Sequence, residues 1–138
     1  MKDLLIQLRA MQLFYHNAHH LVARMPFFSD HEALKEFYEH LDGDYDDVAE
    51  RLIGLTNSDN LNLQAIILGV HDKLQQIPPS FKENSMYFEM GLKLEQELYG
   101  KVDFVIKSGI TEGTKQLLGE ILNQSEMRVY KIKQRIKK

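Results

Sequence analysis

Apolar residues recur every three or four positions along most of the chain, a spacing that predicts long amphipathic helices. The first such stripe runs from residue 3 to about residue 25 and comprises Leu4, Leu8, Met11, Tyr15, Ala18 and Val22. Met25-Pro26-Phe27-Phe28 interrupts the pattern, and Ser29 or Asp30 is expected to cap a second helix that reaches about Leu55. The second stripe comprises Leu34, Phe37, Leu41, Val48, Leu52 and Leu55.

The same spacing continues in the C-terminal half of the chain. A third long helix is expected over residues 80–107, and Ser108-Gly109 is a glycine signal for its end. Thr111-Glu112-Gly113-Thr114 opens a final helix, whose apolar positions are Leu117, Leu118, Ile121, Leu122, Met127, Tyr130, Ile132 and Ile136. No stretch shows the two-residue alternation that would predict a strand.

The connection between the second and third helices is unusually long. It begins with the polar break at residues 57–60, ends at Pro78-Pro79, and spans more than twenty residues, enough to hold a short helix. A connection of this length can run from one end of a bundle to the other. The sequence therefore predicts an all-α fold: a ferritin-like four-helix bundle with a long crossover between helices two and three, in a single domain over residues 1–138.

Composition narrows the chemistry that the chain can perform. Among 138 residues there is no cysteine, which excludes disulfides, thiolate metal sites and thiol nucleophiles and leaves oxygen and nitrogen as metal ligands. The formal net charge of −3 argues against a polycation that coats nucleic acid. No stretch offers the ~20 apolar residues that cross a bilayer, so we expect a soluble, cytoplasmic protein with no membrane partner.

Three of the six histidines fall within five residues, at His16, His19 and His20. His16 and His20 are four residues apart, share one helix face and can together bind a metal ion. His19 lies between them, beside the apolar stripe. Two interpretations remain open from the pattern alone: a metal site, or histidines that are exposed or hydrogen-bonded without a metal.

The second predicted helix carries an acidic run, with Asp42, Asp44, Asp46, Asp47 and Glu50 before Arg51. Asp46 and Glu50 are one turn apart and can present two carboxylates to one cation, a set of hard oxygen ligands that suits iron, manganese or magnesium. A solvated acidic face with local salt bridges is the other interpretation of this run.

Taken together, these groups resemble the Dps family of mini-ferritins. The resemblance rests on His19, on His31 twelve residues later, and on Asp46-x-x-x-Glu50-Arg51, and the stretch 111–121 is similar to the opening of the family's last helix. It implies a ferroxidase site for iron between two subunits, where one gives His19 and His31 and its twofold mate gives Asp46 and Glu50. It further implies a shell of twelve subunits that stores ferric iron and protects against oxidative damage.

Elementary helix geometry agrees with a shared site. His19 and His31 can approach each other across the tight turn at Pro26. Asp46 and Glu50 begin about four turns further along the same helix, or about 22 Å from His31 at 1.5 Å per residue. One chain therefore cannot close the site, whereas an antiparallel mate can bring its carboxylates to the histidines.

The chain departs from the family at two positions. Lys35 stands where the family has a further carboxylate, so that Glu36, Glu39 or Asp42 would have to replace that acid, and His20 stands where the family commonly has Trp. A non-catalytic ferritin-like shell, or a DNA-binding structural protein without efficient ferroxidase activity, is thus the alternative function.

Two further groups complete the candidates. A di-metal site inside one bundle would need Glu-x-x-His motifs, and the chain has none, so His40 and His71 are expected to be exposed or structural. The C-terminal stretch carries five basic residues that could contact DNA phosphates or simply complement a helix dipole: Lys131, Lys133, Arg135, Lys137 and Lys138.

Overall fold

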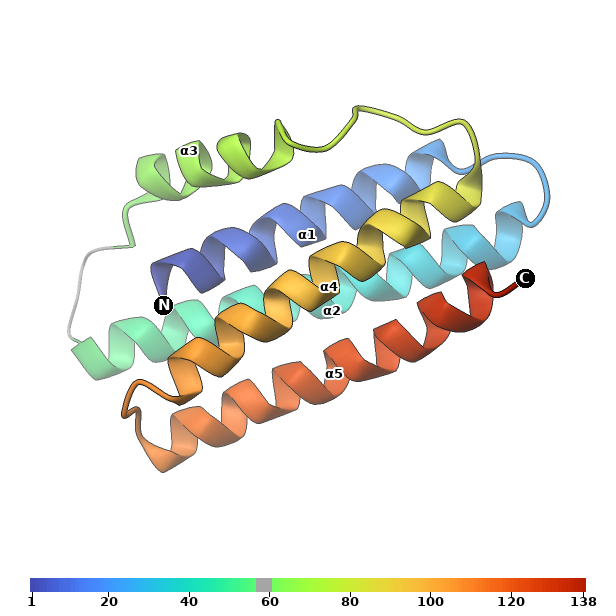
Figure 1. Ribbon diagram of the computed structural model, residues 1–138. Coiled ribbons are helices and arrows are strands. Elements are labelled where there is room, and N and C mark those ends of the chain that lie inside the picture. The colour runs from blue at the N-terminus through green and yellow to red at the C-terminus, as the bar shows by residue number, and fades with distance from the viewer. Residues whose placement is uncertain (57–60) are drawn as a thin grey trace. The chain divides into compact units, whose positions relative to one another are not determined.

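The computed structural model describes residues 1–56 and 61–138, and within them the chain is helical without any strand. The helices are α1 (Lys2–Leu21), α2 (Phe27–Thr56), α3 (Leu63–Leu74), α4 (Asn84–Ile106) and α5 (Glu112–Ile136) (Figure 1). The all-α prediction is confirmed, and the predicted break at 57–60 lies outside the described residues. The chain divides into two compact units, residues 1–84 and 85–138.

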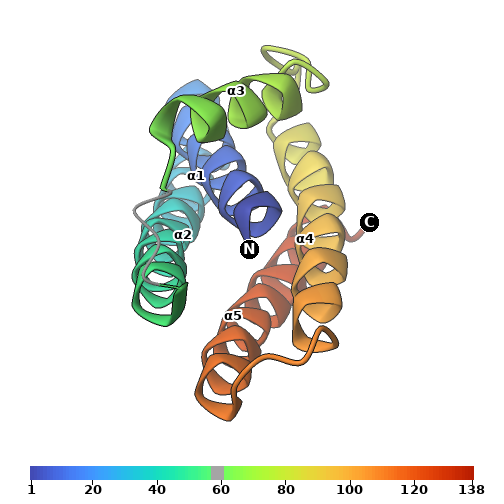
Figure 2. The ribbon, with the colours of Figure 1, turned by 90° about the vertical axis from the view of Figure 1, so that its left-hand side faces the viewer.

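In the first unit, α1 and α2 lie side by side and run in opposite directions (Figures 1 and 2). The predicted stripes are buried through most of both helices, and the Tyr15 and Phe37 rings meet edge to face with centroids 5.2 Å apart. Such an aromatic contact adds to the apolar burial that holds the pair together. The stripe fails at the C-terminal end of α2, where Leu52 is half-buried and Leu55 is exposed.

The turn between α1 and α2 differs from the predicted one. The first helix ends at Leu21 because Val22 adopts an extended backbone. The second begins at Phe27, so Ser29 and Asp30 lie inside its first turn instead of capping it. There the Ser29 hydroxyl donates to the carbonyl of Pro26, while Asp30 is buried and stabilised from outside its own helix.

The crossover holds the expected short helix, α3. Its first turn is capped by Asn62, whose side-chain oxygen accepts from the backbone N–H of Ala65. The helix packs on α1, where Gly69 faces Ile6 so closely that a β-carbon at residue 69 would overlap the Ile6 side chain. The absence of a side chain at residue 69 therefore allows the crossover to lie against the first helix.

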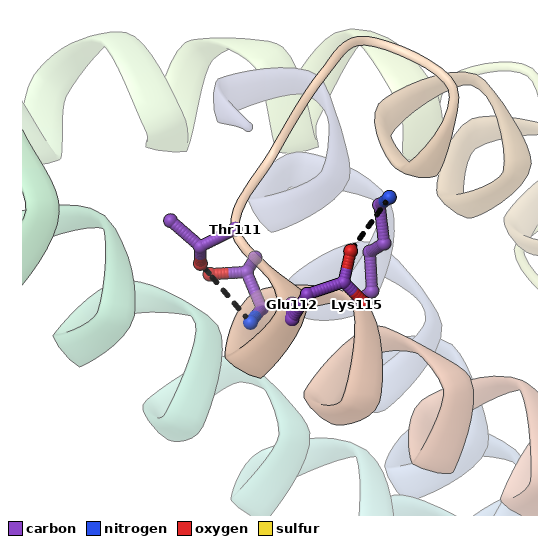
Figure 3. A network of polar contacts seen from close by, with 4 residues as sticks. Thr111, Glu112 and Lys115 are labelled. Carbon is purple, nitrogen blue, oxygen red and sulfur yellow. Dashed lines mark hydrogen bonds and ion pairs between the residues drawn. The ribbon is translucent and has the colours of Figure 1, made fainter.

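The second unit is a hairpin of α4 and α5, which again run in opposite directions (Figures 1 and 2). Gly109 has φ 84°, a conformation that favours glycine, in the turn that follows α4, as its sequence predicts. Thr111 then caps α5 by accepting from the Thr114 N–H, and Lys115 pairs with Glu112 in the first turn (Figure 3).

A buried ion pair joins the two helices of this hairpin. The Arg128 guanidinium donates to both carboxylate oxygens of Glu95 at 2.8 and 3.0 Å, and the Ser125 hydroxyl donates to the same carboxylate at 2.7 Å. All three side chains are almost completely buried. A buried carboxylate needs such partners, because an isolated charge is costly to remove from water.

Candidate metal site

His19 at the end of α1 and His31 at the start of α2 hold each other in place. Nδ1 of His19 lies 2.7 Å from the backbone oxygen of His31, and Nδ1 of His31 lies 2.8 Å from the backbone oxygen of His19. The two rings are stacked, with centroids 3.5 Å apart and planes 20° apart. The predicted approach of these two histidines across the turn is confirmed.

These two hydrogen bonds fix which ring nitrogen is available to a metal. A carbonyl oxygen can only accept, so each Nδ1 must carry the proton that it donates. In a neutral imidazole the other nitrogen, Nε2, then keeps its lone pair. Metal-binding histidines typically use this arrangement, in which a hydrogen bond at one nitrogen orients the ring and raises the basicity of the other.

The surroundings of the pair favour the neutral, ligand form of His19. Burial lowers the pKa of His19 below its ordinary value of 6.5, and the neighbouring imidazoles of His31, His20 and His16 lower it further, against the opposing effect of the backbone hydrogen bond. The Tyr38 ring stacks at 5.4 Å from the His19 ring, and the Phe27 ring at 4.9 Å from that of His31.

The start of α2 is anchored beside this pair. The Asn84 side chain donates to the buried carboxylate of Asp30 at 3.2 Å and accepts from the backbone N–H of Ala23 at 3.1 Å. It thereby connects the turn after α1 to the first turn of α2, where His31 follows Asp30 directly. The position of His31 is thus set by a residue more than fifty positions away in the sequence.

The predicted carboxylate pair lies far along α2 from His31. Asp46 and Glu50, together with Asp47, place carboxylate oxygens within 4.8 Å of one another, and all three side chains are exposed. Asp47 belongs to the predicted acidic run but was not among the predicted ligands, although its spacing of three residues from Glu50 also places these two side chains on one helix face. Since α2 is a continuous helix, fifteen residues separate His31 from Asp46 by about 22 Å, and one chain does not bring the two halves together.

Two of the three acids that could replace the missing carboxylate already have cationic neighbours. Lys35 Nζ lies 4.0 Å from Oε1 of Glu39, one turn further along α2. Asp42 pairs with Arg9 of α1 at 2.9 Å. The ammonium of Lys35 is therefore directed toward the next turn of its own helix.

The other histidines follow the predictions. His16 and His20 share a face of α1, with ring centroids 5.0 Å apart, whereas His40 and His71 are exposed. The Tyr38 ring, 4.1 Å from the His16 ring, was not among the predicted residues. Tyr38 lies seven residues after His31, two turns along the same helix face, and this spacing could have predicted its place beside the histidines.

The basic C-terminal residues lie on the last turns of α5 and just beyond it. Lys131, Lys133, Lys137 and Lys138 are exposed, whereas Ile132 is fully buried. The Arg135 guanidinium lies 5.5 Å from the centre of the Phe88 ring in α4, a cation–π contact that holds it against the hairpin.

Comparisons with known proteins do not identify the chain: no model of a protein family matches it, and no curated protein matches it. Within the described residues, none of the helices is long and apolar enough to cross a membrane.

Proposed function

We propose that the protein is a mini-ferritin of the Dps type, in which Fe(II) is bound and oxidised between two copies of the chain. One copy would supply Nε2 of His19 and of His31, and its twofold mate would supply the carboxylates of Asp46 and Glu50. The observation that carries the proposal is the reciprocal hydrogen bonding of His19 and His31, which prepares two imidazoles as ligands at one end of α2.

The chemistry of the two halves is complementary. Neutral imidazoles suit iron as donors, and carboxylates suit it as hard anionic ligands, so their combination favours Fe(II) and, after oxidation, Fe(III). Neither half is sufficient alone in one chain, because α2 separates them. A second copy packed antiparallel, with α2 against α2, would close two such sites by its symmetry.

The stacking of the two rings supports two iron ions at each site. A metal ion bound to an imidazole lies near the plane of that ring, so nearly parallel rings 3.5 Å apart direct their Nε2 lone pairs toward separate positions. Two metal ions about 3.5–4 Å apart are a common catalytic arrangement. Two adjacent Fe(II) ions would also supply the two electrons that one peroxide accepts.

Iron in this scheme is substrate and cargo. Each of two Fe(II) ions gives one electron to a peroxide molecule, the O–O bond breaks, and the Fe(III) hydrolyses to ferric oxyhydroxide with release of protons. Storage of this mineral inside a closed shell of twelve copies, with a ferritin-like four-helix bundle as each wall element, would remove Fe(II) from reactions that generate radicals.

The direct test is anaerobic addition of Fe(II) followed by peroxide, with ferric absorbance as the readout. We expect fast oxidation by the wild type and at least a tenfold loss in His31→Ala and in Asp46→Ala, because each removes a ligand. His71→Ala and Asp72→Ala are matched controls, since both are exposed residues of α3. Equal rates in all five proteins would reject the proposal.

The alternative function, a ferritin-like shell or DNA-binding structural protein without efficient ferroxidase activity, is favoured by Lys35. Lys35→Asp would restore an acid at this position and distinguishes the two functions. If Lys35 has abolished turnover, Lys35→Asp gains oxidation that the wild type lacks; if the ion pair with Glu39 directs the ammonium away, the wild type already oxidises Fe(II).

The basic residues of α5 provide the test for DNA. We expect any contact to be with phosphates and therefore to be confined to low salt. Plasmid mobility should be measured at several salt concentrations with the wild type and with Lys133→Gln/Lys137→Gln/Lys138→Gln, which retains the buried Ile132. If the plasmid is not shifted even at low salt, the protein does not bind DNA.

A further inference from the structure

A second group of imidazoles lies beside the proposed iron site but is not part of it. His16 and His20 occupy successive turns of α1, with ring centroids 5.0 Å apart and planes 38° apart. His20 is exposed and His16 is half-buried, so solvent ions can reach the pair. Neither ring takes part in a hydrogen bond or ion pair within residues 1–56 and 61–138.

The separation of these two rings is the one that a shared metal ion requires. With metal–nitrogen bonds of about 2.0–2.1 Å and nitrogen–metal–nitrogen angles from about 90° (tetragonal) to about 110° (tetrahedral), the centres of two imidazoles on one ion lie about 4.5–5.3 Å apart. The observed 5.0 Å meets this condition with the helix backbone unchanged. The His19 and His31 rings, 3.5 Å apart and nearly parallel, are too close together to share one ion in this way. The two pairs of histidines therefore differ in how they can bind a metal.

One ring of the pair is fixed from the neighbouring helix. The Tyr38 ring of α2 lies 4.1 Å from the His16 ring, which restricts the rotation of that imidazole about its side-chain bonds. A ligand already restricted in this way loses less entropy when the ion binds. The His19 ring is 6.3 Å from the His16 ring, too far for one ion to hold all three imidazoles. It is 5.3 Å from the His20 ring, but its Nδ1 is held by the backbone carbonyl of His31. Water would fill the remaining coordination positions.

The donor set determines which metals would bind. A site of imidazoles and water, without a carboxylate, suits late borderline cations, and affinity for divalent ions rises from Fe²⁺ through Co²⁺ and Ni²⁺ to Cu²⁺. The proposed iron site combines imidazoles with carboxylates from a second copy. The two sites would therefore select different metals although their histidines are neighbours.

We propose that His16 and His20 form a second metal site, complete within one chain, that binds a borderline divalent cation and Cu²⁺ most tightly. This proposal goes beyond the iron function and does not depend on it, because the site uses neither Asp46 nor Glu50 and needs no second copy.

The test is Cu²⁺ titration of metal-free protein against a competing chelator, with visible absorption and nitrogen hyperfine splitting in electron paramagnetic resonance as readouts. All proteins carry Asp46→Ala, so that the shared site is disabled. We expect one Cu²⁺ per chain with two nitrogen ligands, and about 10–100-fold weaker binding in His16→Gln and in His20→Gln. His40→Gln and His71→Gln are the matched controls and should bind as the parent does.

Circular dichroism checks that each variant keeps its helices, which is expected because both residues are accessible on one face of α1. Unchanged affinity and hyperfine pattern in both His16→Gln and His20→Gln would overturn the proposal. Loss of copper in His31→Ala but not in the other two variants would also overturn it, by assigning the ion to His19 and His31. Neither result bears on peroxide-driven iron oxidation, so the two proposals fail separately.

Discussion

His19 and His31 each donate from Nδ1 to the other's backbone carbonyl oxygen, at 2.7 and 2.8 Å, across the turn that joins α1 and α2. Because this turn is short, the rings of His19 and His31 stack on each other although the two residues are twelve positions apart. The hydrogen bonds fix both rings and leave both Nε2 atoms available. The proposed site thus has its nitrogen ligands prepared before any metal arrives.

The stacked geometry predicts the number of iron ions at the site. Because each ring directs its Nε2 to its own position, anaerobic titration with Fe(II) should saturate at two ions per chain. The titration should use His16→Gln/His20→Gln, which removes the second pair of histidines. Saturation at one ion per chain would mean that His19 and His31 share a single ion, and the two-ion interpretation would be wrong.

The lowered pKa of His19 predicts how stability depends on pH in the metal-free protein. The unfolded chain takes up this proton near pH 6.5, whereas the folded chain takes it up at lower pH, so the unfolded state binds more protons between the two values. Above about pH 6.5 neither state holds this proton, and His19 does not affect the free energy of unfolding through titration. Below that pH the unfolded state gains the proton first, so the free energy of unfolding falls as the pH falls.

Urea unfolding in the presence of a chelator, between about pH 7.5 and about pH 5, measures this effect. His19→Gln should lose less unfolding free energy over this interval than the wild type. His71→Gln controls for the removal of an exposed histidine and should behave as the wild type does. The same pH dependence in all three proteins would show that His19 titrates normally.

The buried pair of Glu95 and Arg128 predicts a strong asymmetry between single and double variants. Arg128→Met leaves a buried carboxylate without its guanidinium and should lower the free energy of unfolding by about 3–5 kcal/mol. Glu95→Met/Arg128→Met removes both charges and should recover most of that loss. Urea unfolding curves give both values.

The exposed pair of Lys107 and Asp103 provides the comparison for this prediction. Its ammonium and carboxylate are 2.7 Å apart, with Asp103 in the last turn of α4 and Lys107 directly after that helix. Both side chains face water, which screens their attraction, so Lys107→Met should change the free energy of unfolding far less than Arg128→Met does. If Arg128→Met costs as little as Lys107→Met, or the double variant is as unstable as the single one, the buried pair does not contribute as described.

The helices could be predicted because their cause is local. Apolar residues that recur every three or four positions identify the buried face of each helix. The turn at Gly109 and the cap at Thr111 depend only on residues close to them in sequence. The start of α2 could not be predicted in the same way. Ser29 and Asp30 look like caps, but Asp30 is stabilised by Asn84, which the sequence gives no means of placing there.

The candidate site shows the same division. The His19–His31 contact was predictable because a short turn joins their helices, and the separation of Asp46 from His31 was predictable because α2 is one continuous helix. The arrangement of the rings was not: stacking, the reciprocal hydrogen bonds and the position of Tyr38 depend on side-chain packing between helices. The pairing of Glu95 with Arg128 joins residues 33 apart and has no local signal.

A site to which one copy supplies the histidines and another supplies the carboxylates is tested most directly by mixing two inactive variants. His31→Ala and Asp46→Ala are unfolded together, refolded as an equal mixture and assayed for Fe(II) oxidation by peroxide. In a mixed twofold pair, one of the two sites combines the intact histidines of one copy with the intact carboxylates of the other. Random pairing should therefore restore about a quarter of the wild-type rate. A mixture no more active than its two components would contradict the shared site.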